Sequence, residues 1–210
     1  MIGCEPFSEK QEAQLIEFYS KQRYAARYIA LLTFGIQTGF RVSEILSLTI
    51  GDLYKGGKMV DRVYIHKRHM KGGNAEGNRA SGRSMILANR TKKALQVQVD
   101  FLAKQGRTAP EQYIFQTMRR GVNQHMDYTS VWRMLNYTAK ELGMTIKVGT
   151  HSMRKTFAAR VFDNLKAKGN PDCLRILQAG LGHMNINNTI KYLSFDEGEL
   201  NESIKDVWGD

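Results

Sequence analysis

The chain has 210 residues, a formal net charge of +11 and a hydrophobic content of 42%, values that indicate one globular domain with its own core. It contains neither a run of 18 apolar residues nor a signal-peptide pattern, so we expect no membrane span and no secretion. Cys4 and Cys173 are far apart and no Cys/His cluster has metal-site spacing. We therefore expect a reduced, cytoplasmic protein without a metal site, with one disulfide as the open alternative.

The positive charge is concentrated in the first 192 residues. They hold 30 bases and 14 acids, a net charge of +16, whereas residues 193–210 hold six acids and one base, a net charge of −5. Such a basic body favours a polyanionic partner, most simply nucleic acid. Charge alone does not decide the matter, because a basic protein of an unrelated class would show the same balance.

The first third of the chain predicts helices followed by a small sheet. Ser8 is a candidate N-cap, and Gly39 is a candidate helix stop. Alternating β-branched and aromatic residues indicate two strands, and the Gly- and Asn-rich residues 71–83 predict a long loop between them. The expected helices are Ser8–Tyr19, Ala25–Gln37 and Ser43–Leu48, and the expected strands are Val60–His66 and Ser84–Leu87.

The rest of the chain predicts helices. Apolar residues recur there at helical spacing, Thr150 is a candidate cap, and Asn170-Pro171 is typical of a helix start. The expected helices are Thr91–Gln105, Thr129–Leu142 with Trp132, Leu135, Ala139 and Leu142 inward, Thr150–Asp163, and one after Asn170-Pro171 with Leu174, Leu177 and Leu181 inward. A further segment, capped by Asn185 or Asn188, carries Tyr192.

Four short motifs contain residue types suited to phosphodiester chemistry. They place Arg41 in T-G-F-R-V-S-E, His151 and Arg154 in T-H-S-M-R-K, His183 in L-G-H, and Tyr192 nine residues after that histidine. Arginines can neutralise the charge that builds on the non-bridging oxygens during attack at phosphorus. A phenol holds its proton at neutral pH, and the arginines or His151 could help to remove it, electrostatically or as a base.

Each of these residues also has a structural alternative. Arg154 lies near a helix start, where backbone N–H groups favour an anion, but it could instead pair with a surface carboxylate. His151 could cap a turn, and Arg41 could form a buried pair with Glu44. Tyr192 could be a surface residue of an amphipathic helix. The complete, ordered set of motifs is what favours catalysis.

In this order the motifs resemble the tyrosine recombinase family, also called the phage integrase family, over residues 6–193. The resemblance implies a mostly helical α+β catalytic domain with a small antiparallel sheet. It implies a site-specific recombinase that cleaves and rejoins double-stranded DNA through a 3′-phosphotyrosyl intermediate, in integration, excision or inversion. Because a phosphodiester is exchanged for a phosphotyrosyl ester, neither ATP nor a metal or other cofactor is expected.

The resemblance also assigns roles to individual residues. Arg41 and Arg154 would clamp the phosphate, with His151 beside them. His183 would donate a hydrogen bond to the phosphate or to the oxygen on the lysine side, with a helix-end cap as its alternative. Tyr192 would be the nucleophile that attacks phosphorus.

A lysine on the hairpin is thought to protonate the leaving 5′ oxygen in this family. Lys71, in M-K-G-G, resembles that residue, and Lys67 is a nearby alternative. The chain departs from the family pattern here, because residues 71–83 form a longer and more Gly-rich loop than usual. Glu44 resembles a structural residue that supports a basic catalytic group.

We expect residues 1–192 to form the catalytic domain and residues 193–210 an acidic tail helix that could be exchanged between protomers. The tail has an apolar stripe that must be covered: Leu200, Ile204, Val207 and Trp208. By resemblance, four protomers on two DNA sites form the working unit, near the nucleoid. No N-terminal core-binding domain is expected within this chain, which is either a short recombinase or a fragment.

Two other functions share part of this pattern. A type IB topoisomerase uses the same cleavage chemistry, but the L-G-H motif and the predicted tail helix argue against it. A non-catalytic DNA-binding regulator with the same fold would not need all five site residues intact. The target sequence, accessory DNA-bending proteins and the direction of recombination are not encoded in any readable motif.

Overall fold

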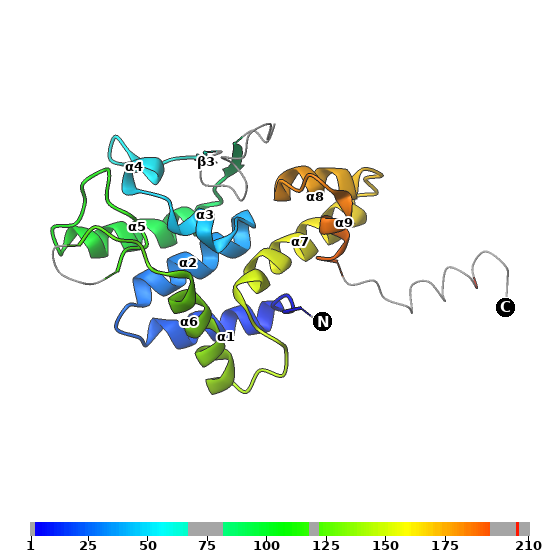
Figure 1. The fold of residues 1–210 in the computed structure, drawn as a ribbon, viewed down its shortest axis with the longest axis horizontal. Helices are drawn as coiled ribbons and strands as arrows, with labels where there is room; N and C mark the ends of the chain where they lie inside the picture. The colour runs from blue at the N-terminus through cyan, green and yellow to red at the C-terminus, as the bar shows by residue number, and fades with distance from the viewer. Residues whose placement is uncertain (1–2, 67–81, 118–121, 194–204, 206–210) are drawn as a thin grey trace.

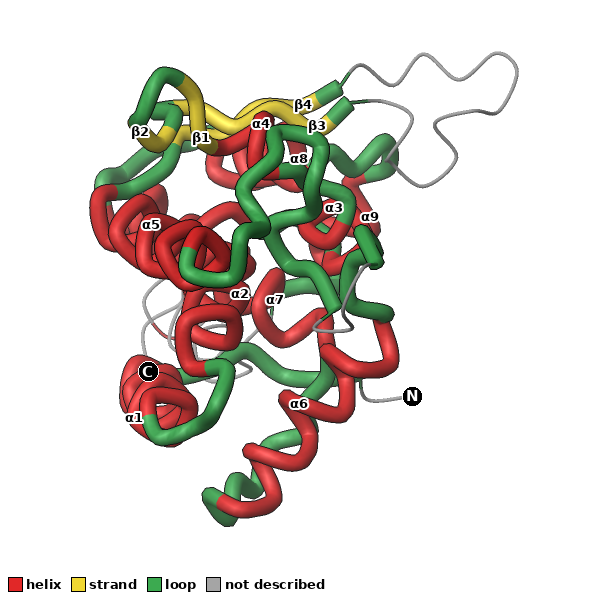
Figure 2. The backbone as a smooth tube through the Cα atoms, turned by 90° about the vertical axis from the view of Figure 1, so that its left-hand side faces the viewer, coloured by secondary structure: helices red, strands yellow, loops and turns green. Residues whose placement is uncertain are grey.

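The computed structural model describes residues 3–66, 82–117, 122–193 and 205. Helices dominate these residues, with two short hairpins at one side (Figures 1 and 2). The expected mostly helical domain with a small antiparallel sheet is therefore confirmed. The larger helices are α1 (Glu9–Ser20), α2 (Ala25–Thr38), α5 (Asn89–Ala103), α6 (Tyr128–Glu141), α7 (Thr150–Ala167) and α8 (Cys173–Leu181); the short ones are α3 (Val42–Leu46), α4 (Ile50–Leu53) and α9 (Ile186–Ile190).

Helix α2 is the centre of the main core. Its residues 30–36 are all buried, and it packs on both α5 and α7. The helix ends at Gly39, whose φ of 61° is left-handed. A Cβ there would lie 2.4 Å from Cδ1 of Phe157, so only glycine allows this close approach of α2 and α7. The turn at Gly39 directs the chain into Arg41, the N-cap of α3.

The predicted hairpin is present, with a shorter first strand than expected and a second strand that starts one residue earlier. β3 (Arg62–Ile65) pairs antiparallel with β4 (Arg83–Ile86) in the register Arg62↔Ile86 and Ile65↔Arg83. A second hairpin, β1 (Tyr54–Lys55) with β2 (Lys58–Met59), was not predicted. Two-residue strands are too short to show alternation; the signal was the Gly-Gly pair between them, with φ values of 56° and 79° at Gly56 and Gly57.

The structure corrects the predicted starts of α7 and α8. Gly149, not Thr150, is the N-cap of α7, and its backbone N–H donates to Oγ of Ser152 at 3.1 Å. Arg154 therefore lies in the second turn of α7, and the helix continues past Asp163 to Ala167. Helix α8 starts at Cys173, because Asn170-Pro171 belongs to the preceding turn.

The inner face of α6 also differs from the expectation. Trp132 is 45% exposed, whereas Leu135 is buried together with the residues four before and three to four after it: Val131, Thr138 and Ala139. A period of 3.6 residues places Trp132 about 100° away from Val131 around the helix axis. In α8, Leu177 and Leu181 are buried as expected, while Leu174 is only half-buried.

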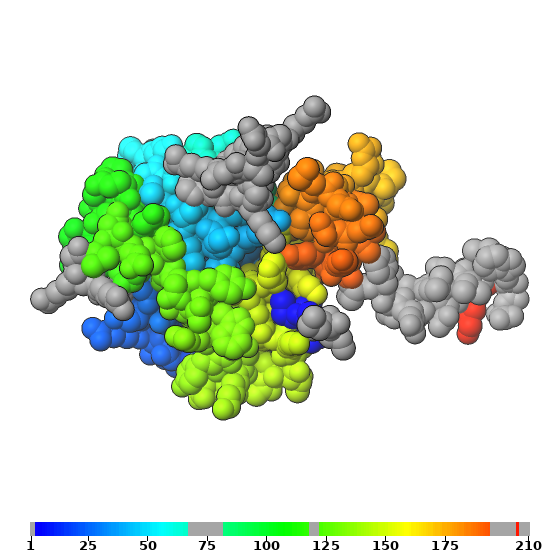
Figure 3. Space-filling model, in the orientation of Figure 1, coloured from blue at the N-terminus to red at the C-terminus, as the bar shows by residue number. Residues whose placement is uncertain are grey.

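Helix α8 packs on α7 through a second, smaller apolar cluster, and α9 packs on α8. The cluster consists of Phe157, Ala158, Leu177 and Leu181, with Tyr192 and Leu193 partly buried against it. In the space-filling view the segment of α8 and α9, coloured orange, forms a lobe at the side of the body (Figure 3). Asn185 is the cap of α9, and Tyr192 lies in the turn after the helix ends. The predicted tail helix falls almost wholly outside the described residues. Among the described helices, none has the length and apolar content of a membrane span.

Candidate active site

Tyr192 and His151 lie side by side at the junction of α7 with the turn after α9. His151 Nδ1 is 2.9 Å from the Tyr192 hydroxyl oxygen. Their positions follow from the fold: His151 is in the first turn of α7, and Tyr192 is held against that helix by the smaller apolar cluster. The contact gives the phenol a proton acceptor, or a hydrogen-bond donor, at its oxygen.

Arg154 lies directly behind this pair and is 1% exposed. Its guanidinium donates to the carbonyl oxygens of Gly39 and Leu181, each at 2.6 Å, and its Cζ lies 5.6 Å from the centre of the Tyr192 ring. Burial, followed by the charges of Arg83 and Arg41, lowers the pKa of Arg154 to about 10. It stays protonated at neutral pH, and its Nε–H has no partner among the described residues.

His183 completes the contacts of Arg154. Its Nε2 is 2.8 Å from a guanidinium nitrogen of Arg154, and its Nδ1 is 3.0 Å from Oγ1 of Thr189. Because a guanidinium only donates hydrogen bonds, Nε2 must accept and Nδ1 must carry the proton. Burial, then the charge of Arg154 and of Arg41, lowers the pKa of His183 to about 3. The imidazole is therefore neutral.

In the structure, the side chain of His183 therefore accepts a hydrogen bond from Arg154 and helps to fix its position. The helix-end role, which was the alternative for this residue, falls to its backbone: Gly182 has a φ of 64°, and the His183 N–H donates to the carbonyl of Gln178 at 3.1 Å. Both functions coexist because the backbone and the side chain are separate donors and acceptors.

Arg41 approaches the same place from α3. Its side chain is 25% exposed, and its Nη1 donates to Oε1 of Glu44 at 2.9 Å. The Arg41 backbone N–H donates to Oε2 of the same carboxylate at 2.7 Å. The pair with Glu44, considered above as an alternative to catalysis, is present and also fixes Arg41 at the edge of the site.

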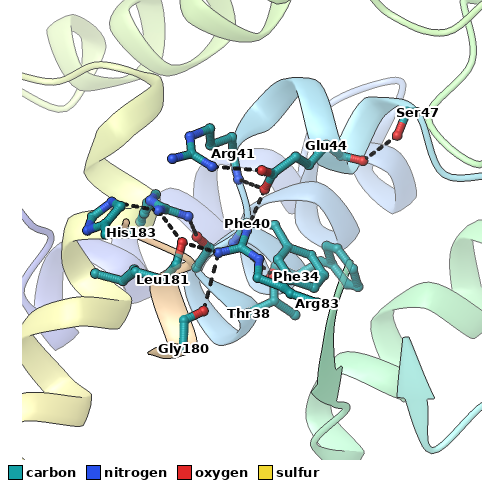
Figure 4. A network of polar contacts seen from close by, with 12 residues as sticks. Phe34, Thr38, Phe40, Arg41, Glu44, Ser47, Arg83, Gly180, Leu181 and His183 are labelled. Atoms are coloured by element: carbon teal, nitrogen blue, oxygen red, sulfur yellow. Dashed lines mark hydrogen bonds and ion pairs between the residues drawn. The ribbon is translucent and has the colours of Figure 1, made fainter. Parts of the chain in front are cut away.

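Arg83 is the residue that the sequence motifs did not identify. It is the first residue of β4 and is 8% exposed. Its guanidinium contacts the other carboxylate oxygen of Glu44 and the carbonyls of Gly180 and Leu181 (Figure 4). An arginine among the polar residues of a predicted loop carries little signal; its buried position depends on where β4 meets α3 and α8.

A small cavity of about 80 Å³ opens between α3, α6 and α7. Arg41, His151 and Arg154 line it, together with Tyr128, whose hydroxyl is 2.6 Å from Oγ1 of Thr150. Near it, Arg41 and Arg83 share the carboxylate of Glu44, whereas Arg154 donates to carbonyl oxygens and contacts His183, so positive charge exceeds negative charge. The excess positive charge makes the site suitable for an anion.

Of the six predicted site residues, the structure brings five together: Arg41, His151, Arg154, His183 and Tyr192. Lys71 and its alternative Lys67 lie outside the described residues, so the choice between them stays a prediction. The second strand of the hairpin, β4, reaches the site, because its first residue, Arg83, contacts Glu44.

Comparison with known proteins places this geometry in a family. The profile described as the phage integrase family matches residues 5–199. Tyrosine recombinase XerD of Chlamydia trachomatis is 28% identical over 170 residues, which are 80% of this chain and 48% of that protein. The chain thus spans about half the length of such curated relatives.

Solved structures share the fold. The crystal structure of XerA recombinase matches with a TM-score of 0.69 and 24% identity, over 99% of this chain and 66% of that one. XerH site-specific recombinase, bound to its palindromic difH substrate in a post-cleavage complex, matches with a TM-score of 0.68 and 19% identity, over 98% and 53% of the two chains. With the profile match over nearly its whole length, the chain belongs to the phage integrase family.

Proposed function

We propose that the protein is a site-specific DNA recombinase that cleaves and rejoins duplex DNA through Tyr192. The observation that carries the proposal is the 2.9 Å contact between the Tyr192 hydroxyl and His151, next to a cluster of arginines with an excess of positive charge. The likeness to XerH, a protein whose structure is described as bound to a DNA substrate after cleavage, supports DNA as the substrate.

In the proposed reaction the Tyr192 oxygen attacks the scissile phosphorus, and its proton passes to His151. The phosphorus–O5′ bond breaks, leaving a 3′-phosphotyrosyl ester and a 5′ hydroxyl. The leaving O5′ takes a proton from a general acid, for which Lys71 is the candidate. Attack by the 5′ hydroxyl of a partner strand reverses these steps and restores tyrosine.

Arg41 and Arg154 neutralise the charge that grows on the non-bridging oxygens. This electrostatic work replaces what a metal ion would supply. One ester is exchanged for another, so we propose a cycle that requires neither ATP nor a metal. We further propose a cytoplasmic tetramer on two DNA sites, with residues 1–192 as the catalytic unit and residues 193–210 as the contact to a neighbouring protomer.

The decisive experiment is covalent capture on nicked duplex DNA from the native locus. The parent protein should form an adduct that survives a denaturing gel. Tyr192→Phe should bind the same DNA and form no adduct, because only the attacking oxygen is lost. Tyr128→Phe, which removes the hydroxyl group of the tyrosine that lines the cavity, should still form the adduct.

Two results would contradict the proposal. Adduct formation by Tyr192→Phe, or its loss in Tyr128→Phe alone, would assign the nucleophile elsewhere. A supercoil-relaxation assay beside a two-site recombination assay separates strand exchange from topoisomerase activity.

A further inference from the structure

Arg83 has a buried charge that the reaction described above does not use. Its side chain is 8% exposed, and its Cζ lies 4.6 Å from the centre of the Phe40 ring. Burial lowers its pKa, while the carboxylate of Glu44 opposes that effect. Burying an arginine costs free energy unless its contacts compensate for the lost hydration. The groups that contact Arg83 therefore indicate its role.

Two of the three acceptors that Arg83 contacts are shared with the arginines of the phosphate clamp. The carboxylate of Glu44 receives Arg83 at Oε2 and Arg41 at Oε1, the latter at 2.9 Å. The carbonyl of Leu181 receives Arg83 and also Arg154, the latter at 2.6 Å. Figure 4 shows the contacts of Glu44 with Arg41 and Arg83, and the contact of Arg83 with Leu181.

These contacts form a chain in the order Arg41, Glu44, Arg83, the Leu181 carbonyl, Arg154. Its first two members come from the start of α3, its middle from β4, and its last two from the end of α8 and from α7. Arg83 is therefore the link that joins the two halves of the clamp. A guanidinium suits this task because its planar set of donors reaches two acceptors in fixed directions.

We propose that Arg83 is a positioning residue that holds Arg41 and Arg154 at a fixed separation around the scissile phosphate without touching it. The proposal rests on the proposed function, because it assigns a role within that reaction. Arg83 also has an electrostatic effect. Its charge adds to those of Arg41 and Arg154, and the carboxylate of Glu44 balances only one of the three, so an entering phosphate relieves the repulsion among the guanidinium groups.

The variant Arg83→Lys tests the geometry of the Arg83 contacts separately from the charge of the side chain. A lysine keeps the positive charge but offers a single nitrogen on a flexible stem, which cannot reproduce the fixed fork between Glu44 and the carbonyls. Arg83→Met removes the charge as well. Cleavage is measured in single turnovers on nicked DNA of the sequence mapped by covalent capture, with either a native phosphate or a neutral methylphosphonate at the scissile position.

Arg27 provides a matched control. It is 6% exposed, donates to the carbonyl of Gln116 at 3.0 Å and stacks over Tyr24 and Tyr28, with Cζ 4.5 and 5.2 Å from the ring centres. It is thus a buried arginine with carbonyl and aromatic partners, but in another part of the fold. Arg27→Lys therefore measures how the loss of a buried guanidinium affects the stability of the protein without changing the phosphate clamp.

We expect Arg83→Lys to cleave the native phosphate at least about tenfold more slowly than the parent, as for a weakened oxyanion clamp, and Arg83→Met more slowly still. DNA binding should change little. The defect should shrink on the methylphosphonate, which needs less charge neutralisation. Arg27→Lys should be slowed by the same small factor on both substrates.

The inference is overturned if Arg83→Lys cleaves the native phosphate within about twofold of the parent, or if its defect is equal on both substrates. Guanidinium NMR signals of Arg41 and Arg154 give a readout without cleavage: Arg83→Lys should shift them and Arg27→Lys should not. Unshifted signals also refute the linkage. Absence of any cleavage by the parent would instead refute the proposed function, and the NMR comparison would still decide the role of Arg83.

Discussion

His183 should make the stability of the protein sensitive to mild acid. In the folded protein its imidazole is neutral, because Nε2 accepts from Arg154 and burial beside three arginines opposes a further positive charge. In the unfolded chain a histidine titrates near about 6.5. The pKa of His183 is thus lower in the folded protein than in the unfolded chain. Its effect on the free energy of unfolding is therefore constant above about pH 6.5, and stability falls as the pH drops below that value.

The size of this loss follows from the two pKa values. With a folded pKa of about 3 and an unfolded value of about 6.5, His183 alone reduces the free energy of unfolding by about 2 kcal/mol between pH 7.5 and pH 5. The figure is insensitive to the folded value, because any folded pKa below about 4 leaves the group neutral at pH 5. The loss should continue to grow down to about pH 3.

Urea unfolding of the parent and of His183→Gln at several pH values measures this directly. Glutamine can still accept from Arg154 through its side-chain oxygen but does not titrate. The difference between the two proteins should therefore narrow by about 2 kcal/mol on going from pH 7.5 to pH 5. Parallel curves for parent and His183→Gln would refute the neutral, accepting histidine.

Three further predictions test the proposed mechanism. Arg41→Ala and Arg154→Ala should each lower cleavage by about 10²-fold or more, as for the loss of an oxyanion donor, while DNA binding falls much less because other bases contact the backbone; rates within a few-fold of the parent would contradict the clamp. A 5′-bridging phosphorothiolate, whose sulfur leaves without an acid, should rescue Lys71→Ala in the cleavage assay, and rescue of Lys67→Ala instead would reverse that assignment. Deletion of residues 197–210 should preserve or strengthen single-site binding in gel shifts but reduce two-site complexes and recombination, so normal synapsis by the shortened protein would exclude an assembly role for the tail.

The sequence by itself determined the class of fold, the family and the five residues that the structure brings together. Hydrophobic periodicity located most helices, because each helix buries one face, and Gly39 marked a helix end that needs left-handed backbone. The spacing of T-H-S-M-R-K is local information: three residues along a helix place His151 and Arg154 on neighbouring turns.

Only the tertiary structure decided what each of those residues contacts. The tautomer of His183 depends on Arg154 and Thr189, and the exposure of Trp132 depends on which face of α6 meets the body. Arg83 was not predicted because its importance comes from contacts with Glu44 and Leu181, 39 and 98 residues away. Such partners cannot be predicted from the local sequence pattern, because the groups that compensate a buried charge come from distant segments that pack against it only in the folded protein.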